Sequence, residues 1–245
     1  MPQAAATVDP AEIARFEAIA AEWWDQDGKF RPLHRLNPVR LAWIRDRLTA
    51  HFARAGEGLR PYAGLSVLDV GCGGGLVAEP MARLGARVTA IDAARGNVEI
   101  ARLHARQSGL AIDYRHAAAE EIAAGGERFD VVLALEVVEH VADRDAFLRA
   151  CATLLAPGGA LVLATLNRTP QAFLLAIVGA EYVLGWLPRG THEWRKFVRP
   201  SELAAGLRPH GVGVRGFAGL RYDPIGDSWR ETSDLSVNYM AWATR

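Results

Sequence analysis

The sequence predicts an α/β fold in which a seven-stranded, mostly parallel sheet carries helices on both faces. Beyond residue 65, short apolar runs alternate with helical stretches, and this alternation is typical of parallel sheets. The run Asp130–Leu135 is almost continuously apolar, as expected of a strand buried on both faces. With 245 residues, 50% of them hydrophobic, the chain can bury a full core without disulfides or a structural metal.

Two helices are expected ahead of the sheet. A helical pattern begins at Glu12 and continues to Trp24, with its apolar side chains on one face. Asp25–Arg35 is polar and contains glycine and proline, so we expect a loop there. Asn37 and Pro38 are typical of an N-cap followed by the first helical position, and they predict the start of the second helix.

The chain is therefore expected to consist of an N-terminal helical extension, residues 1–60, and a main domain, residues 61–245. An apolar and basic insert, residues 168–199, follows the fifth strand of that domain. Strands are expected at Ser66–Val70, Arg87–Ile91, Ala111–Tyr114, Asp130–Leu135, Ala160–Leu166, Val212–Leu220 and Leu235–Trp242. Helices are expected at Leu76–Leu84, Asn97–Ser108 and Asp145–Leu155. The last two strands have no long helix between them and could pair as an antiparallel edge.

Charge and cysteine content exclude several classes of protein. Lys and Arg together number 28, as do Asp and Glu, so bulk electrostatic attraction to nucleic acid is excluded. Cys72 and Cys151 lie far apart in the sequence and indicate neither a disulfide framework nor a metal-binding motif. The N-terminus has no charged region ahead of an apolar stretch, so we expect no secretory signal and a reducing, cytoplasmic environment.

A glycine cluster at the end of the first strand is the sharpest local signal. The run Val67–Gly75 (VLDVGCGGG) leads from an apolar strand into a tight, glycine-rich turn, where the backbone can approach a ligand closely. A dinucleotide fingerprint starting at Gly71 would need a third glycine at position 76, which is Leu76. Asp92 ends the next strand, where a carboxylate can accept hydrogen bonds from ribose hydroxyls. The alternatives are a turn without a ligand and an Asp92 that only caps the following helix.

These residues resemble the seven-stranded S-adenosylmethionine-dependent methyltransferases, which have a Rossmann-like fold. The resemblance implies that Gly71 and Gly73 lie in the cofactor loop, that Asp92 holds the ribose, and that Leu135 lies beside the cofactor at the end of the fourth strand. Many members of that class carry an acid after the third strand to bind the adenine amine. This chain has Ala117-Ala118-Ala119 there, so the adenine contact stays unassigned.

A closer resemblance covers about residues 12–242. The segments that carry it are FEAIAAEWW at Phe16–Trp24, KFRPLHRLNPVR at Lys29–Arg40, EVVEH at Glu136–His140, TLNR at Thr165–Arg168, VGAEYV at Val178–Val183, Gly190–His192 with Lys196-Phe197, and VNYM at Val237–Met240. They are similar to the ubiquinone-biosynthesis O-methyltransferases. The resemblance implies S-adenosylmethionine-dependent methylation of polyprenylated catechol and demethylubiquinol rings, at two O-methylation steps.

The motif after the fourth strand is the candidate for proton transfer or metal binding. A phenol has a pKa near 10, so a base or a metal must help it to ionise. Glu136, Glu139 and His140 have the spacing of one face of a helical turn, and they could hold a divalent cation. The resemblance implies Mg²⁺ or a similar ion at this motif. We expect His140 and Glu136 to be catalytic; the alternatives are a metal-free His140 base and a merely structural polar helix start.

Arg40 is a candidate ligand of the cofactor carboxylate. In the first turn of the predicted helix, a cation would be opposed by the helix dipole by about 0.3–1 kcal/mol, so a nearby anion would offset the cost. The resemblance also places an arginine against the cofactor here. The alternative is an arginine exposed to solvent.

The apolar segment Ala172–Leu187 lies between the fifth strand and the closing elements. As a helix it would reach roughly 24 Å, which is short of the roughly 30 Å of a hydrocarbon core. Basic residues and tryptophan near it suit an anionic membrane surface. Because the implied substrate carries an isoprenoid tail, we expect peripheral association with the inner membrane, and contact with other ubiquinone-pathway enzymes is possible. The alternative for this segment is a buried core helix.

Three other functions compete with this interpretation. An NAD-type oxidoreductase is disfavoured by Leu76 and by a chain too short for a separate substrate domain. A cofactor-binding scaffold without turnover is a second alternative. The third is an O-methyltransferase that acts on another small phenolic acceptor, which the glycine loop alone would permit equally well.

Overall fold

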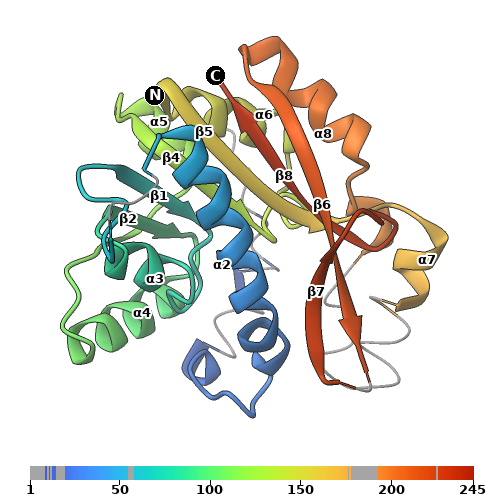
Figure 1. Cartoon of the computed structure of the whole chain (residues 1–245), viewed down its shortest axis with the longest axis horizontal. Coiled ribbons are helices and arrows are strands. Elements are labelled where there is room, and N and C mark those ends of the chain that lie inside the picture. Colours follow the sequence, from blue (N-terminus) through green and yellow to red (C-terminus); the bar gives the residue numbers. More distant parts are fainter. Residues whose placement is uncertain are drawn as a thin grey trace.

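The fold is built on one eight-stranded sheet (Figure 1). The computed structural model describes residues 9, 11, 13, 14, 20–54, 58–175, 177, 193–224 and 226–245. Its strands are β1 (Ser66–Val70), β2 (Arg87–Asp92), β3 (Asp113–His116), β4 (Phe129–Leu135), β5 (Leu155–Leu166), β6 (Gly213–Asp223), β7 (Ser228–Thr232) and β8 (Asn238–Thr244). Its α-helices are α2 (Arg31–His51), α3 (Ala78–Arg83), α4 (Arg95–Gln107), α5 (Ala119–Ala124), α6 (Arg144–Thr153), α7 (Pro170–Ala172) and α8 (Pro200–Leu207).

The strand order β3-β2-β1-β4-β5-β8-β6-β7 confirms the predicted mixed sheet. The five neighbouring strands β3, β2, β1, β4 and β5 are parallel, and β8 pairs antiparallel with both β5 and β6. In this arrangement the carboxyl ends of β1, β2 and β4 lie side by side at one edge of the sheet. That edge is where ligands bind in open parallel sheets.

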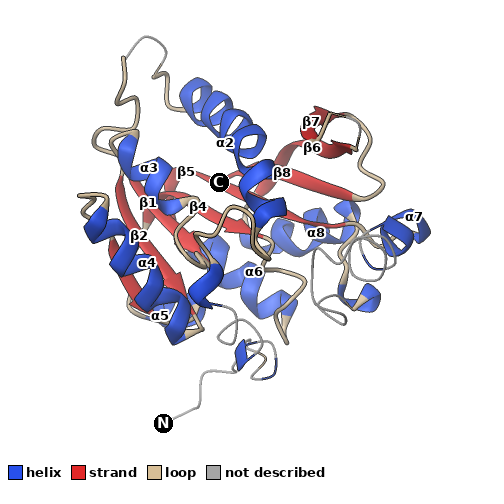
Figure 2. Ribbon diagram, turned by 90° about the horizontal axis from the view of Figure 1, so that it is seen from below, coloured by secondary structure: helices blue, strands red, loops and turns tan. Residues whose placement is uncertain are grey.

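Helices cover both faces of the sheet, as predicted (Figure 2). Because side chains alternate along a strand, Val67 of β1 packs with α2, α3 and α4, whereas its neighbour Leu68 packs with α5, α6 and α8. In β4, Leu133 and Val132 divide between the two layers in the same way. The nearly continuous apolar runs of the sequence therefore reflect burial on both faces.

The sheet has eight strands rather than the predicted seven. The additional strand, β7, pairs antiparallel with β6, with Gly219 opposite Thr232. Its sequence, SWRET, has no apolar run, and most of its side chains are exposed or half-buried at the sheet edge. Three short helices, α5, α7 and α8, were also not predicted.

The second helix begins earlier than predicted. Helix α2 starts at Arg31, with Pro32 in its first turn, so residues 31–35 do not belong to a loop. Pro38 lies inside the helix, and Asn37 is not its N-cap. Instead, the Asn37 side chain donates a hydrogen bond of 2.7 Å to the carbonyl oxygen of Leu76, which ties α2 to the chain just after the glycine loop. Apolar side chains of α2 share the core cluster that contains β1 and β4.

Two predictions extend beyond the described residues. Of the first predicted helix, the described part includes the short 3₁₀ helix η1 (Ala20–Glu22), and residues 12 and 15–19 lie outside the described residues. Of the apolar insert, residues 176 and 178–192 lie outside them. Among the described residues, no helix has the length and hydrophobicity that crossing a bilayer requires. Cys72 and Cys151 are both buried free thiols.

Candidate active site

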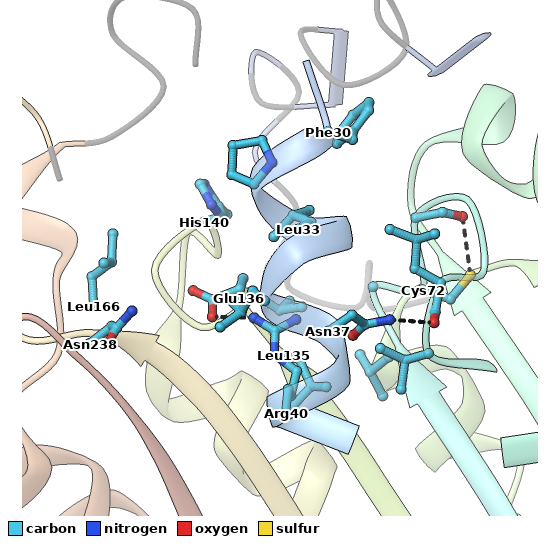
Figure 3. A pocket seen from close by; sticks show the side chains of 18 of the residues that line it. Phe30, Leu33, Asn37, Arg40, Cys72, Leu135, Glu136, His140, Leu166 and Asn238 are labelled. Carbon is cyan, nitrogen blue, oxygen red and sulfur yellow. Dashed lines mark hydrogen bonds and ion pairs between the residues drawn. The ribbon is translucent and has the colours of Figure 1, made fainter. Parts of the chain in front are cut away.

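A cavity of about 780 Å³ opens at the carboxyl ends of the parallel strands. Helix α2 passes across it, between the glycine loop and the end of β4 (Figure 3). All but one of the predicted site residues line this cavity: Arg40, Gly71, Gly73, Asp92, Leu135, Glu136 and His140. The exception is Glu139. Residues chosen from four separate stretches of sequence therefore meet in one place.

The glycine loop after β1 needs glycine for close packing as well as for backbone conformation. Gly71 has a φ of +70°, and a Cβ there would overlap the side chain of Val137. Gly73 has a φ of +52°, and a Cβ there would overlap the indole ring of Trp23. The N-terminal segment thus packs directly on the loop, which the sequence alone did not indicate.

Asp92 lies at the end of β2 with its carboxylate held by three donors. The backbone N–H of Gly73 donates to Oδ2 at 2.9 Å, and the N–H of Ala94 donates to Oδ1 at 2.8 Å. The amide of Asn97 also donates to Oδ1, at 3.2 Å. Burial raises the pKa of Asp92, and these three hydrogen bonds oppose the rise. Asp92 therefore holds the loop as well as the start of α4, and it also faces the cavity.

Asp69 is a cavity residue that the sequence analysis missed. It lies within β1, and its Oδ2 has no hydrogen-bond partner among the described residues. Burial, with a smaller contribution from the charge of Asp92, raises the pKa of Asp69 to about 7, and Arg40 opposes this rise. The available signal was a lone acid in an otherwise apolar strand, because buried acids are rare unless they have a function or a partner.

Arg40 is buried, with 4% of its surface exposed, so the alternative of a solvent-exposed side chain is wrong. It lies in the third turn of α2, and the argument from the helix dipole therefore does not apply. Its Nη2 donates to Oε1 of Glu136 at 2.8 Å, and its Nε has no partner among the described residues (Figure 3). Glu136 has a φ of +56°, which is strained for a residue with a side chain.

The predicted metal-binding motif does not form a cluster. Residues 138–140 form a turn rather than a helix, and the Glu139 carboxylate points away from the cavity into the core, where Oε2 accepts a hydrogen bond of 2.8 Å from Thr165. Burial, followed by the charge of Glu136, raises the pKa of Glu139 to about 8. Within the described parts of the chain, no three His, Cys, Asp or Glu side chains gather as metal ligands. As arranged, Glu136, Glu139 and His140 do not form one common set of metal ligands.

The far side of the cavity is mostly apolar. Helix α2 contributes Leu33 and Leu36, and the β6–β7 hairpin contributes Tyr222 and Trp229. These two aromatic rings lie with their centroids 5.4 Å apart. Because β7 was not predicted, this wall was not predicted either. His140 lies on the same side of the cavity as Leu166 and Asn238 (Figure 3).

Comparison with known proteins identifies the family of this chain. A sequence family described as "Methyltransferase domain" matches residues 68–163. A ubiquinone biosynthesis O-methyltransferase of Parvibaculum lavamentivorans is 55% identical over 242 residues, which cover 99% of this chain and 96% of that protein. One from Paramagnetospirillum magneticum is 57% identical over 239 residues, covering 98% and 96%. The chain belongs to the ubiquinone biosynthesis O-methyltransferases.

Solved structures agree on the fold of this O-methyltransferase. Magnesium protoporphyrin IX methyltransferase from Synechocystis PCC 6803, with bound SAH, aligns with a TM-score of 0.64 at 20% identity, over 95% of this chain and 97% of that one. An S-adenosylmethionine-dependent methyltransferase from Clostridium acetobutylicum aligns with a TM-score of 0.62 at 10% identity, over 94% and 98%. The Rossmann-like methyltransferase fold is thereby confirmed, and the family's methyl donor is S-adenosylmethionine.

Proposed function

We propose that this chain methylates ring hydroxyls of polyprenylated catechol and demethylubiquinol intermediates, with S-adenosylmethionine as the donor. The observation that carries the proposal is the make-up of the cavity. One end is formed by the glycine loop and Asp92, and the other end by an apolar wall beside His140. A polyprenylated ring is largely apolar and suits such a wall. The names of the relatives point to the same class of substrate.

The cofactor end fits the donor residue by residue. Asp92 would accept hydrogen bonds from the ribose hydroxyls, while Gly71 and Gly73 would let the backbone lie against the methionine part. Arg40 would bind the donor's carboxylate, and its unpaired Nε supports this role. Leu135 would lie beside the donor at the end of β4.

The chemistry is an in-line displacement. The phenolic oxygen attacks the methyl carbon, the carbon–sulfur bond breaks, and S-adenosylhomocysteine leaves with the electron pair. The phenolic proton must be taken up by a base, and a neutral imidazole such as that of His140 can accept it near neutral pH. Glu136, fixed by its ion pair with Arg40, would orient the acceptor and stabilise the imidazolium. The apolar wall would exclude water from the reacting atoms.

The test is methyl transfer to a short-chain demethylated quinol, followed by mass spectrometry. If His140 is the base, His140→Ala should lower kcat by about 10²–10⁴-fold while the affinity for S-adenosylmethionine changes little. Wild-type rates in His140→Ala would exclude the general-base role.

A Mg²⁺ requirement stays a prediction, and the same assay tests it. Since Glu139 faces the core, Glu139→Ala should change stability more than metal dependence. If activity needs Mg²⁺ and Glu139→Ala alters that dependence, the motif must rearrange to bind the ion. If chelator has no effect on the wild type, the metal prediction is wrong.

We further propose that the cytoplasmic enzyme meets its substrate at the inner-membrane surface. Phe173, Leu174 and Leu175 follow α7 with half or nearly half of their surfaces exposed, and Leu175 also lines the cavity. Exposed apolar residues at the mouth of a cavity would favour contact with lipid and with a substrate that dissolves in it.

A further inference from the structure

The N-terminal segment forms part of the cofactor end of the cavity. Trp23 is buried and lines the cavity, and it stacks on Phe30 with ring centroids 3.8 Å apart. Its indole lies against Gly73, where any side chain would collide with it. The backbone N–H of the same glycine donates a hydrogen bond to the Asp92 carboxylate. The tryptophan, the loop and the acid therefore form one packed unit.

A chain of hydrogen bonds links Trp23 to Asp92 through Asn97. The indole Nε1 of Trp23 donates to Oδ1 of Asn97 at 2.8 Å, and Nδ2 of Asn97 donates to Oδ1 of Asp92 at 3.2 Å. An indole N–H can only donate, so the oxygen of the Asn97 amide must face Trp23. The NH₂ group must then face the carboxylate. Trp23 thus fixes which end of the amide Asp92 meets.

We propose that Trp23 and Asn97 are positioning residues that hold Asp92 ready for the cofactor ribose, so that the N-terminal extension is an integral part of the methyl-donor site. This inference rests on the proposed role of Asp92. Asn97 and Trp23 are both buried, so water cannot readily replace either partner. Loss of the indole donor would leave the amide free to turn over. It could then present its oxygen, an acceptor, to the carboxylate.

The neighbouring Trp24 provides a matched control. Its indole Nε1 also donates to the glycine loop, at 2.9 Å to the carbonyl oxygen of Gly74, and its ring stacks on His104. It does not contact Asn97 through a hydrogen bond and does not line the cavity. Trp24→Phe therefore removes a comparable hydrogen bond from the same segment but leaves the link to Asp92 intact.

The experiment measures the dissociation constant of S-adenosylhomocysteine by calorimetry for four variants of the full chain: Trp23→Phe, Asn97→Ala, the double variant and Trp24→Phe. Trp23→Phe retains a ring that can stack on Phe30 but loses the donor and part of the ring that lies against Gly73, and Trp24→Phe controls for the same loss of ring size. We expect Trp23→Phe to raise the dissociation constant about tenfold and Asn97→Ala to raise it at least as much. The dissociation constant of Trp24→Phe should stay within about twofold of the wild-type value. Because Trp23 acts through Asn97, the double variant should bind no more weakly than Asn97→Ala.

Kinetics and melting separate positioning from structural support. For Trp23→Phe, the KM for S-adenosylmethionine should rise about tenfold with little change in kcat. The melting temperatures of Trp23→Phe and Trp24→Phe should fall by similar amounts. The inference would be overturned if Trp23→Phe bound the ligand as tightly as wild type, or if Trp24→Phe lost as much affinity as Trp23→Phe. It would also be overturned if the fold-losses of affinity of the two single variants multiplied in the double variant. Asp92→Ala tests separately whether Asp92 binds the cofactor. If this variant binds S-adenosylhomocysteine as tightly as wild type does, the proposed role of Asp92 is wrong, whatever the roles of Trp23 and Asn97.

Discussion

At the scale of single residues, two buried acidic side chains line the cofactor end of the cavity. Asp69 and Asp92 both line the cavity, and burial raises the pKa of each. An acid with a pKa near 7 is partly protonated at neutral pH. Each unit by which its pKa is raised corresponds to about 1.4 kcal/mol by which the site disfavours the ionised carboxylate. A donor that carries a sulfonium and an ammonium group would relieve this cost by favouring the ionised carboxylates.

Binding of S-adenosylmethionine should therefore release a proton from Asp69. The pKa of Asp69 is about 7 in the free protein, and a bound cation lowers it, so release should be largest near pH 6–7. It should vanish near pH 9, where the carboxyl group is already ionised. Calorimetry in buffers of different ionisation enthalpy measures the number of protons released. Asp69→Asn should abolish most of it, and equal release in wild type and variant would contradict this account.

At the scale of elements, the loop after β1 is shaped by what packs on it. Five parallel strands meet at one sheet edge, and α2 and the segment around Trp23 close over that edge. The loop accommodates this cover because Gly73 leaves room for the indole ring. The glycine-rich loop therefore packs against the N-terminal extension of its own chain.

A pair of glycine substitutions separates the cost of the positive φ from the cost of displacing Trp23. Gly73 and Gly109 both have positive φ, at +52° and +65°, but a Cβ at Gly109 meets nothing within 4 Å. Gly109→Ala should cost only the backbone strain, roughly 1–2 kcal/mol in the free energy of unfolding. Gly73→Ala should cost more and should weaken donor binding at least tenfold, because it displaces Trp23. Chemical denaturation and calorimetry check the two effects. Similar behaviour of the two variants would show that only φ matters.

The sequence predicted those elements whose own residues form a recognisable apolar pattern. Continuous apolar runs identified β1, β2, β4 and β5, since these strands are buried on both faces. Strand β7 lies at the edge of the sheet and depends on pairing with β6, so its polar sequence carried no such signal.

Long-range contacts explain the remaining differences. Asn37 and Pro38 have the pattern of a helix start, yet Pro32 fills that position, and Asn37 instead contacts Leu76 from inside α2. In the site, Gly71 and Asp92 were identified by their places after strands. The pairing of Arg40 with Glu136 joins residues 96 positions apart, and no local pattern could reveal it.

At the scale of the whole molecule, the exposed apolar residues after α7 include Leu175, which lines the cavity. If this face meets the membrane, Leu174→Asp should reduce binding to vesicles that contain anionic lipid. Leu103→Asp on α4 is the control, since Leu103 is 52% exposed and Leu174 is 58% exposed. Co-sedimentation with vesicles measures both. We expect at least a threefold loss of bound protein for Leu174→Asp alone, and equal binding by wild type and both variants would exclude this membrane surface.

The proposed function requires that one cavity brings a methyl donor to the ring hydroxyl of a prenylated acceptor. The most direct test compares kcat/KM for a short-chain prenylated catechol and for unprenylated catechol, with isotope-labelled S-adenosylmethionine and mass spectrometry of the product. The account predicts one labelled methyl group on a ring oxygen and a kcat/KM at least tenfold higher for the prenylated ring, because the apolar wall binds the tail. Equal values for the two rings, or label on neither, would contradict it.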